Sequence, residues 1–486
     1  MLGVDVDPGI GAEISDYFSF YVPGYKFMPA YKNKVWDGKI RLFNRMTGEL
    51  NAGLFVYLHK FCAERGYELD VQESDYGLPG TVEPVQEWDA WIRAGALAFE
   101  PYDYQVKAVQ TALERQRAIL LSPTGSGKSY IIYLAIKYWI SMIPEGEHKK
   151  VLVIVPTTSL VEQLYNDFKD YGMLVEKAVH RIYSGKDKNT DKKIIISTWQ
   201  SIYKNPRKWF EQFGMVVGDE CHGFKSKSLS SIMNKATEAK YKIGCTGTLD
   251  GTQTHKLVLE GLFGPVYQVT TTKNLQDNKT LAALNISVLA LTYSEETRQK
   301  AKDYTYQAEI DFLISHEKRN NFIRNLALDQ KGNTLVLFQR VANHGKILFD
   351  LIDKGAAENR KVFFVSGQTE TSDREAIRKI VEKQKDAIIV ASLGTFSTGI
   401  NIRNLHNIIF ASPSKSQIKV LQSIGRGLRQ ADDGRDTRLF DIADDLRYKK
   451  RVNYTLSHSA ERIKIYEQEQ FNFKRYEIGL EHGHSL

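Results

Sequence analysis

The chain has 486 residues, 42% of them hydrophobic and 26% charged, which is the balance of a globular protein too long for one ordinary domain. The formal charge of +8 favours an anionic partner such as nucleic acid, with a generally basic enzyme surface as the alternative. Three cysteines are too few for a disulfide framework, so we expect a reducing, cytoplasmic location.

Neither secretion nor membrane insertion is supported by the sequence. The chain begins MLGVDVDPGI, with acidic residues where a signal peptide needs positive charge. The longest apolar tract runs from Tyr130 to Pro144 and is interrupted by Lys137, which disfavours a membrane span. We therefore expect no membrane partner.

Residues 1–95 have the pattern of a small α+β domain. KIRLF predicts a strand, and GLFVYLHKFCAERGY predicts the helix that follows it. Residues 96–278 then alternate short β-branched runs with helical patterns, which is typical of βαβ units in a parallel sheet covered on both faces. The predicted strands are AILLS, VLVIVP, KIIIST, MVVGDE and YKIGCTGT.

A break in this alternation separates a second α/β domain from the first. The stretch from Thr270 to Asn285 predicts a linker, and residues 279–486 form the second domain. Its last segment, VNYTLSHSAERIKIYEQEQFNFKRY, predicts a helix that either docks on this domain or contacts a ligand. The predicted strands are ISVLALTY, TLVLF, VFFVSG, DAIIVAS, NIIFASP and RLFDIAD.

A glycine-rich loop, SPTGSGKSY, lies between the strand AILL and a helix that begins near Lys128. Its glycines permit backbone conformations in which successive N–H groups point at phosphate oxygens, and the helix N-terminus adds its positive end. In this pattern Lys128 contacts the β- and γ-phosphates of ATP and Ser129 binds Mg²⁺. The predicted nucleotide-binding residues are Thr124, Gly125, Ser126, Gly127, Lys128 and Ser129.

Two adjacent carboxylates, Asp219 and Glu220, end the predicted strand MVVGDE. On a buried strand they would repel each other and lose hydration, so they need a compensating cation. Ligands of open parallel sheets bind at this end of the strands, and a bound Mg·ATP supplies the cation. Asp219 would then hold Mg²⁺ and Glu220 would deprotonate the attacking water. A zinc site at Cys221 and His222 is disfavoured, because no second ligand pair lies nearby in the sequence.

Four motifs occur in a fixed order on the two α/β domains. They are SPTGSGKS, DECH, TGT at Thr246 to Thr248, and QSIGRGLRQ at Gln422 to Gln430. Together they resemble the motifs of superfamily 2 helicases and translocases, over about Tyr102 to Asp445. The resemblance implies two RecA-like parallel-sheet motor domains in tandem, preceded by the small α+β domain. Ser122 replaces the first glycine of the strict phosphate-loop pattern, a position that helicase loops commonly relax.

The resemblance assigns roles to further residues. Gln105 in PYDYQ looks like the adenine-reading glutamine, although Tyr102 stands where many relatives have arginine. In the first motor domain, the residues that match backbone-contacting motifs are Pro156, Thr157, Thr198 and Gln200. The residues implied to couple hydrolysis to these contacts are His222, Thr246 and Thr248. In the second motor domain, the implied DNA contacts are Arg340, Ser392 and Thr398, and Gly399 lies near the nucleotide.

The motif QSIGRGLRQ places a glutamine and two arginines on one helical face. Gln422, Arg426 and Arg429 are spaced by four and three residues, and such spacings share a face. Two guanidinium groups there need an anion. Either the arginines act as arginine fingers and bind the γ-phosphate of ATP, or they form a surface salt-bridge network with the acids of ADDGRD.

Within the superfamily, the chain resembles the UvsW-type helicases of tailed bacteriophages. Three stretches carry this resemblance: NPRKWFEQFGMVVGDECH, GTFSTGINIRNLHNIIF and the segment Pro23–Gly48. In that segment cations outnumber the single acid, Asp37, and aromatic residues are interleaved with them. The cations would contact phosphates while the aromatics stack on bases or act as a wedge at a junction. Alternatively, the aromatics form a small core and the lysines a solvated rim. The predicted DNA contacts are Lys34, Trp36, Lys39 and Arg41.

We therefore expect an ATP-dependent DNA helicase or translocase that unwinds and branch-migrates forks, Holliday junctions and R-loops during phage replication, recombination and repair. Its cofactors would be ATP and Mg²⁺, and its partner branched, single-stranded or double-stranded DNA, with an RNA–DNA hybrid as a further substrate. We expect a monomer. Two alternatives stay open: a double-strand DNA translocase that does not separate strands, and a junction-binding or annealing protein whose ATP site only regulates affinity.

Overall fold

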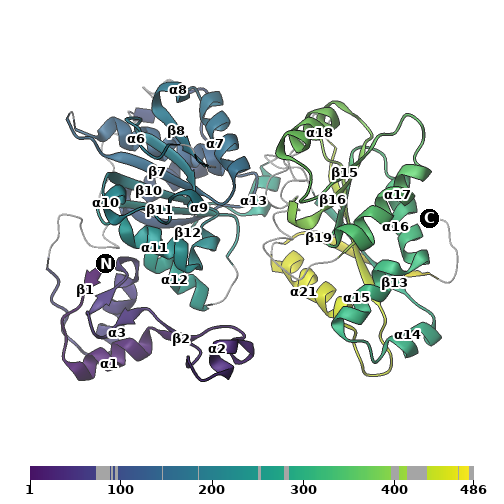
Figure 1. Ribbon diagram of the computed structural model, residues 1–486, viewed down its shortest axis with the longest axis horizontal. Helices are drawn as coiled ribbons and strands as arrows, with labels where there is room; N and C mark the ends of the chain where they lie inside the picture. The colour runs from purple at the N-terminus through teal and green to yellow at the C-terminus, as the bar shows by residue number, and fades with distance from the viewer. Residues whose placement is uncertain are drawn as a thin grey trace. The chain divides into compact units, whose positions relative to one another are not determined.

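The computed structural model divides the chain into two compact units (Figure 1). The first comprises Met1–Ser122 and Ser126–Thr270, and the second comprises Pro123–Gly125 and Thr271–Leu486. Within the described residues, no helix has the length and apolar character needed to cross a bilayer. The residues that the structure describes are 1–72, 88, 91–92, 97–144, 146–183, 185, 187–249, 253–278, 284–395, 404–412, 435–468 and 470–480.

The first unit begins with a small α+β domain, which confirms the prediction from the sequence. Its helices α1 (Pro8–Tyr17) and α3 (Phe55–Arg65) pack on an antiparallel sheet in the order β1–β5–β4. The strands of this sheet are β1 (Leu2–Gly3), β4 (Phe43–Asn44) and β5 (Glu49–Leu50). A second hairpin consists of β2 (Ser19–Tyr21), η1 (Tyr25–Phe27), α2 (Pro29–Lys32) and β3 (Lys39–Arg41). The short helix η2 (Ala52–Leu54) leads into α3.

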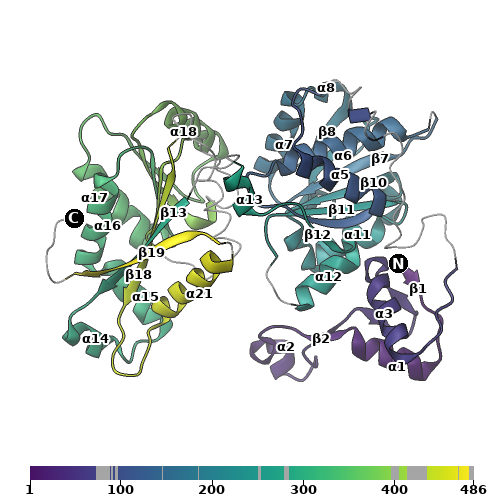
Figure 2. The same cartoon turned by 180° about the vertical axis from the view of Figure 1, so that it is seen from behind.

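The rest of the first unit is built on a seven-stranded sheet in the order β12–β6–β11–β10–β7–β9–β8, with every pair parallel (Figure 2). Its strands are β6 (Arg117–Leu121), β7 (Lys150–Val155), β8 (Val179–Ile182), β9 (Ile194–Thr198), β10 (Phe213–Asp219), β11 (Tyr241–Thr246) and β12 (Val266–Gln268). Its helices are α5 (Asp103–Arg115), α6 (Lys128–Met142), α7 (Thr158–Asp170), α8 (Val175–Ala178), α9 (Trp199–Ile202), α10 (Arg207–Phe210), η3 (Cys221–Lys225), α11 (Lys227–Lys235) and α12 (Gln253–Phe263).

Both faces of this first sheet are buried. Along β7, Val151, Val153 and Val155 belong to one apolar cluster, while Leu152 and Ile154 belong to another on the opposite face. Strands covered on both sides are apolar at every position, which is why the sequence predicts the five central ones. The sequence does not predict the edge strands β8 and β12, which are short and only partly buried.

The second unit is also built on a seven-stranded parallel sheet, whose strands have the order β15–β16–β14–β17–β18–β13–β19. Its strands are β13 (Leu284–Thr292), β14 (Thr334–Phe338), β15 (Val362–Val365), β16 (Ile388–Ser392), β17 (Asn407–Phe410), β18 (Thr437–Asp445) and β19 (Asn472–Gly479). Its helices are α13 (Thr272–Asp277), α14 (Glu295–Ala301), α15 (Tyr306–Ser315), α16 (Glu317–Asp329), η4 (Val341–Gly345), α17 (Lys346–Gly355), α18 (Thr371–Lys383) and α21 (Tyr454–Gln468). The two parallel sheets confirm the prediction of tandem RecA-like domains. The predicted domain boundaries at residues 95 and 278 stay predictions.

Two segments of the second unit differ from the expectation. The predicted linker contains helix α13, and the predicted last helix ends at Gln468. Residues beyond it form β19, which pairs in parallel with β13 along its whole length. The charged residues of this segment are compatible with a solvated helix or with an edge strand. The segment forms a strand because its backbone hydrogen-bonds to the edge of β13.

Two buried arginines bind aspartates on β18. Arg462 of α21 donates to Asp441 from Nε at 3.0 Å and from Nη2 at 2.7 Å, and the Tyr466 hydroxyl donates to the same carboxylate at 2.9 Å. Arg319 of α16 donates to Asp444 from Nε at 2.7 Å and from Nη2 at 3.0 Å. All four charged side chains are at most 2% exposed, so each pair is tolerated only because both partners are present.

We expect Asp441→Asn to lower the free energy of local unfolding by about 3–5 kcal/mol, because it leaves the Arg462 charge buried without its partner. Hydrogen–deuterium exchange at the amides of β18 and α21 measures this loss. The matched control is Glu296→Gln, which removes an exposed carboxylate paired with Lys300 on α14 and should leave the exchange rates nearly unchanged, because exposed ion pairs contribute little to stability. Equal effects of the two substitutions would contradict the prediction.

Candidate active site

The phosphate loop joins β6 to α6 at the carboxyl edge of the first sheet. Gly125 (φ +87°) and Gly127 (φ +78°) have left-handed backbone conformations that favour glycine. A Cβ atom on Gly127 would lie 2.4 Å from Nε2 of Gln105, so a larger residue would also collide with α5. The hydroxyls of Ser122 and Ser126 are hydrogen-bonded at 2.5 Å. The serine that replaces the first glycine of the strict pattern therefore closes the loop.

Gln105 fixes the phosphate loop to the start of α5. Its buried side chain donates from Nε2 to the Ser126 carbonyl at 2.9 Å and accepts from the Tyr102 N–H at 3.0 Å. The Tyr104 hydroxyl donates to the same Ser126 carbonyl at 3.2 Å. The loop is thus positioned by the protein's own contacts, and the adenine-reading role of Gln105 stays a prediction. The sequence does not predict the contribution of Tyr104, whose only signal is its place beside Gln105.

Asp219 and Glu220 lie at the carboxyl end of β10, as predicted. Burial and the neighbouring Glu220 charge raise the pKa of Asp219 to about 6, while Lys128 acts in the opposite direction. The Glu220 N–H donates to Oδ1 of Asp219 at 3.0 Å. Glu220 has φ +49°, a left-handed conformation in which a residue other than glycine stores strain of about 1–3 kcal/mol.

These groups form a donor set that fits Mg²⁺ and ATP. Mg²⁺ prefers oxygen ligands, and a divalent cation would relieve the repulsion that raises the pKa of Asp219. Lys128 is the first residue of α6, with Nζ 3.4 Å from the Ser122 carbonyl. The Ser129 hydroxyl follows it and lies 2.8 Å from the Tyr171 hydroxyl. Asp219 and Ser129 would hold the ion, and Lys128 would contact the phosphates.

A chain of polar contacts leads from Glu220 to the TGT motif. Nδ1 of His222 lies 3.3 Å from Oε2 of Glu220 and 2.9 Å from Oγ1 of Thr246. Thr246 donates in turn to the Thr248 carbonyl at 3.0 Å. Because the single hydroxyl proton of Thr246 is used there, His222 must donate from Nδ1. The three residues predicted to couple hydrolysis to strand contacts are therefore connected to the predicted general base.

The predicted strand contacts of the first motor domain gather at the ends of two adjacent strands. β7 and β9 pair up to Val155 and Thr198, so Pro156 and Thr157 lie beside Thr198. Nε2 of Gln200 donates to the Pro156 carbonyl at 3.5 Å. The structure brings these residues together, and their contact with DNA stays a prediction.

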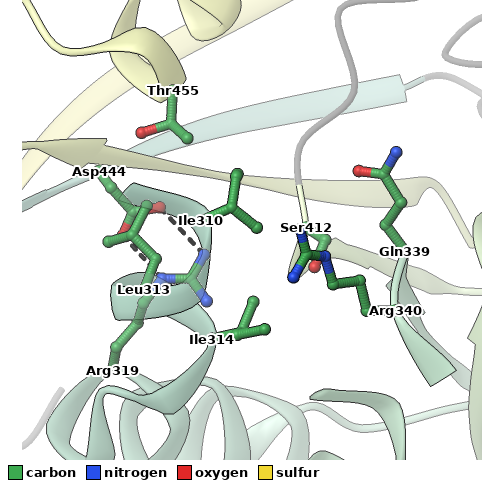
Figure 3. Close-up of a pocket in the computed structure, with 9 residues that line it drawn as sticks. All are labelled: Ile310, Leu313, Ile314, Arg319, Gln339, Arg340, Ser412, Asp444 and Thr455. Atoms are coloured by element: carbon green, nitrogen blue, oxygen red, sulfur yellow. Dashed lines mark hydrogen bonds and ion pairs between the residues drawn. The ribbon is translucent and has the colours of Figure 1, made fainter. Parts of the chain in front are cut away.

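In the second motor domain, Arg340 and Ser392 lie at the ends of the paired strands β14 and β16. Nη1 of Arg340 is 2.5 Å from Oδ1 of Asp311. Arg340 also lines a cavity of about 20 Å³, on whose other side Arg319 binds Asp444 (Figure 3). The sequence does not predict this pair, because a helical arginine looks like a surface residue until its partner strand is known. The other residues that line the cavity are Ile310, Leu313, Ile314, Gln339, Ser412 and Thr455.

Five predicted residues of the second motor domain lie outside the described residues. They are Thr398, Gly399, Gln422, Arg426 and Arg429. Their expected roles in gripping DNA, approaching the nucleotide and acting as arginine fingers stay predictions.

The predicted DNA contacts of the N-terminal domain have different surroundings. Nε1 of Trp36 donates to the Lys39 carbonyl at 2.8 Å, so the indole is held within the domain. Arg41 forms an ion pair with Asp37, and this hydrogen bond lowers the pKa of Asp37 to about 2. Lys34 is exposed and has a left-handed backbone, with φ +56°. Among these residues, Lys34 is the one most open to an external anion.

Comparison with known proteins agrees with this arrangement. Residues 2–72 match the family model of the N-terminal domain of DNA helicase UvsW, residues 98–251 that of the res subunit of type III restriction enzymes, and residues 317–431 that of the conserved helicase C-terminal domain. The ATP-dependent DNA helicase uvsW of Enterobacteria phage T4 is 36% identical over 98% of this chain and 97% of its own length. The chain belongs to the UvsW family. It is a superfamily 2 ATP-dependent DNA helicase.

Solved structures include members and non-members of the UvsW family. The crystal structure of T4 UvsW is 34% identical and covers 98% of this chain and 97% of that chain, with a TM-score of 0.49. A fragment of an HsdR subunit of a type I restriction enzyme from Vibrio vulnificus YJ016 is 17% identical. It covers 87% of this chain and 74% of that chain, with a TM-score of 0.60, and so shares the fold alone.

We expect Glu220→Gln to lower the rate of ATP hydrolysis by roughly 10²–10⁴-fold while ATP still binds, because an amide cannot accept the proton of the attacking water. Lys128→Ala should weaken ATP binding itself. Equilibrium binding of a fluorescent ATP analogue, measured beside phosphate release, separates the two effects. Glu176→Gln, an exposed acid on α8 of the same domain, is the charge-matched control and should change neither. Unchanged hydrolysis in Glu220→Gln would exclude Glu220 as the general base.

We expect Thr246→Val to lower the number of base pairs opened per ATP by about tenfold, within the usual range of coupling between sites. Valine keeps the buried shape but removes the hydroxyl that joins His222 to the Thr248 carbonyl. Parallel assays of strand displacement and phosphate release measure the ratio. Thr111→Val removes a hydroxyl that donates only within α5 and should leave the ratio unchanged. A proportional fall of both rates in Thr246→Val would mean that the hydroxyl serves hydrolysis and not coupling.

Proposed function

We propose that this helicase uses Mg·ATP hydrolysis to translocate on DNA and to unwind and branch-migrate forks, Holliday junctions and R-loops. It would act in phage replication, recombination and repair, as a monomer in the host cytoplasm. The observation that carries the proposal is a path of polar contacts, in which Glu220 lies 3.3 Å from His222 and hydrogen bonds join His222 through Thr246 to Thr248. A protein whose ATP site only regulated affinity would not need the general base connected to this motif.

The residues of the first motor domain account for hydrolysis. Lys128 would bind the phosphates, and Glu220 would accept the proton of the attacking water. When bound by Asp219 and Ser129, Mg²⁺ would neutralise the charge on the phosphate oxygens. Gln105 keeps the loop in place through the Ser126 carbonyl, so little reorganisation is needed when ATP arrives.

Strand movement would follow from a change at Glu220 that reaches the DNA contacts. A charge or proton change at Glu220 would change the electrostatic surroundings of His222, which is hydrogen-bonded to Thr246 of the TGT motif. Pro156, Thr157, Thr198 and Gln200 would grip the backbone of one strand, and Arg340 and Ser392 would grip it from the second motor domain. Contacts of this kind are salt-dependent and largely independent of sequence.

We expect forks and four-way junctions to stimulate ATP hydrolysis at least tenfold more than linear duplex does, because the proposed substrate is a branch. Phosphate release is measured with a fork, a four-way junction, linear duplex, single-stranded DNA and RNA, beside displacement of a labelled strand. Stimulation by linear duplex alone, without displacement, would favour the double-strand translocase.

The same panel with Glu220→Gln tests the binding-protein alternative. Junction remodelling that survives in this variant would favour an annealing or junction-binding protein, because a motor needs hydrolysis at every step. Hydrolysis that no nucleic acid alters would reject the motor altogether. Glu176→Gln again serves as the charge-matched control.

A further inference from the structure

The hairpin of β2 and β3 carries a small lobe, residues 21–39, that contains η1 and α2. In both views the α2 end of this lobe is set apart from α1 and α3, with which it shares the N-terminal domain (Figures 1 and 2). The lobe is therefore a projection of the domain and not a part of its main core, whose buried residues come from α1, α3 and the β1–β5–β4 sheet.

Three tyrosines pack against one another in the lobe, although Tyr21 remains 53% exposed. The rings of Tyr21 and Tyr25 stack at 4.6 Å, and Tyr25 meets Tyr31 edge to face at 4.7 Å. Gly38 has φ +85°, and a Cβ atom there would lie 2.3 Å from the Tyr25 ring. Together with the Trp36 hydrogen bond to the Lys39 carbonyl, these contacts hold the lobe in one shape.

Two large apolar side chains are left outside this cluster. Phe27 is 80% exposed and Val35 is 82% exposed, and Met28 beside Phe27 is 37% exposed. The lobe already contains aromatic partners that could cover a phenylalanine, yet Phe27 packs against none of them. Exposed apolar groups that share one small projection indicate an interaction site.

The charges around these side chains indicate what the partner is. Lys26, Lys32 and Lys34 are exposed, and none of them forms an ion pair within the part of the chain that the structure describes. The single acid of the lobe, Asp37, is neutralised by Arg41. A lobe that carries both exposed apolar side chains and exposed cations matches nucleic acid, which presents flat apolar base faces between phosphates.

We propose that Phe27 and Val35 form a wedge that enters between the bases at the branch point of the DNA, while Lys26, Lys32 and Lys34 contact the flanking phosphates. This inference rests on the proposed function, because a wedge has paired bases to separate only where the protein opens a duplex at a branch. Apolar side chains inserted at a base step unstack it and bend the duplex. The wedge would open the pairs that translocation brings to it.

The N-terminal domain is fixed to the first motor domain, so that the wedge moves with it. The Tyr57 hydroxyl of α3 donates to Oε2 of Glu260 on α12 at 2.6 Å, and Glu260 is buried. A Cβ atom on Gly53 would lie 1.9 Å from the Glu260 carbonyl, so η2 and α12 are in close backbone contact. Helix α12 is the next helix after the TGT motif. DNA pulled by the motor would therefore be driven against a lobe whose parent domain is fixed to that motor domain.

The test is the double substitution Phe27→Ala with Val35→Ala in the full chain. We expect the number of fork base pairs opened per ATP hydrolysed to fall about tenfold, and Phe27→Trp to keep at least half of the wild-type ratio, because tryptophan preserves an aromatic wedge. The matched control is Met46→Ala. Met46 is 93% exposed in the turn between β4 and β5 of the same domain, and its loss should leave the ratio unchanged.

A second readout needs no hydrolysis. With 2-aminopurine at the branch point and a non-hydrolysable ATP analogue, the wild type should raise the fluorescence at saturating protein, and the double variant should not. The wedge proposal is overturned if the double variant keeps both the wild-type number of base pairs opened per ATP and the wild-type rise in fluorescence. It is also overturned if Met46→Ala lowers these two quantities as much as the double variant does. If the wild type hydrolyses no ATP on forks, the proposed function fails, while the fluorescence still decides whether these side chains unstack bases.

Discussion

Two carboxylates held side by side at the end of a buried strand, with one lysine to offset them, are the constraint on which the active site depends. The site carries more negative charge than its surroundings can solvate, as the raised pKa of Asp219 shows. The strained backbone of Glu220 adds to this cost. A metal–nucleotide complex bound here would relieve that repulsion, and the relief would contribute to its affinity.

The sequence predicts the parts of the fold that are governed by burial and order along the chain. Strands covered on both faces are continuous apolar runs, so the sequence places Lys128 at the start of a helix and Asp219 and Thr246 at the ends of strands, where the structure has them. Contacts between distant segments are not predictable in this way. Nothing local indicates that Arg319 binds Asp444, that Gln105 holds the Ser126 carbonyl, or that the last described segment is a strand.

The N-terminal domain shows why composition alone leaves two interpretations open. An aromatic residue between lysines suits either a small core or a nucleic-acid surface, and the lobe uses both. Tyr25 and Tyr31 pack inside, whereas Phe27 faces outward. The difference comes from the turn at Gly24, where φ is +74°, and from the helical turn that follows it. The direction of each ring is set by backbone geometry that residue order does not reveal.

The topology of the second sheet has a consequence for how the chain is made. Strand β13 is the first of that sheet in the sequence, yet its partners are β18 and β19, the last two. At ~5–20 residues per second, roughly 7–30 s pass between synthesis of β13 and synthesis of β18. During that time both edges of a long apolar strand lack their partners, and such edges readily pair with other chains. Temporary protection of this strand, by a chaperone or by the ribosome surface, would therefore favour correct folding of the second sheet.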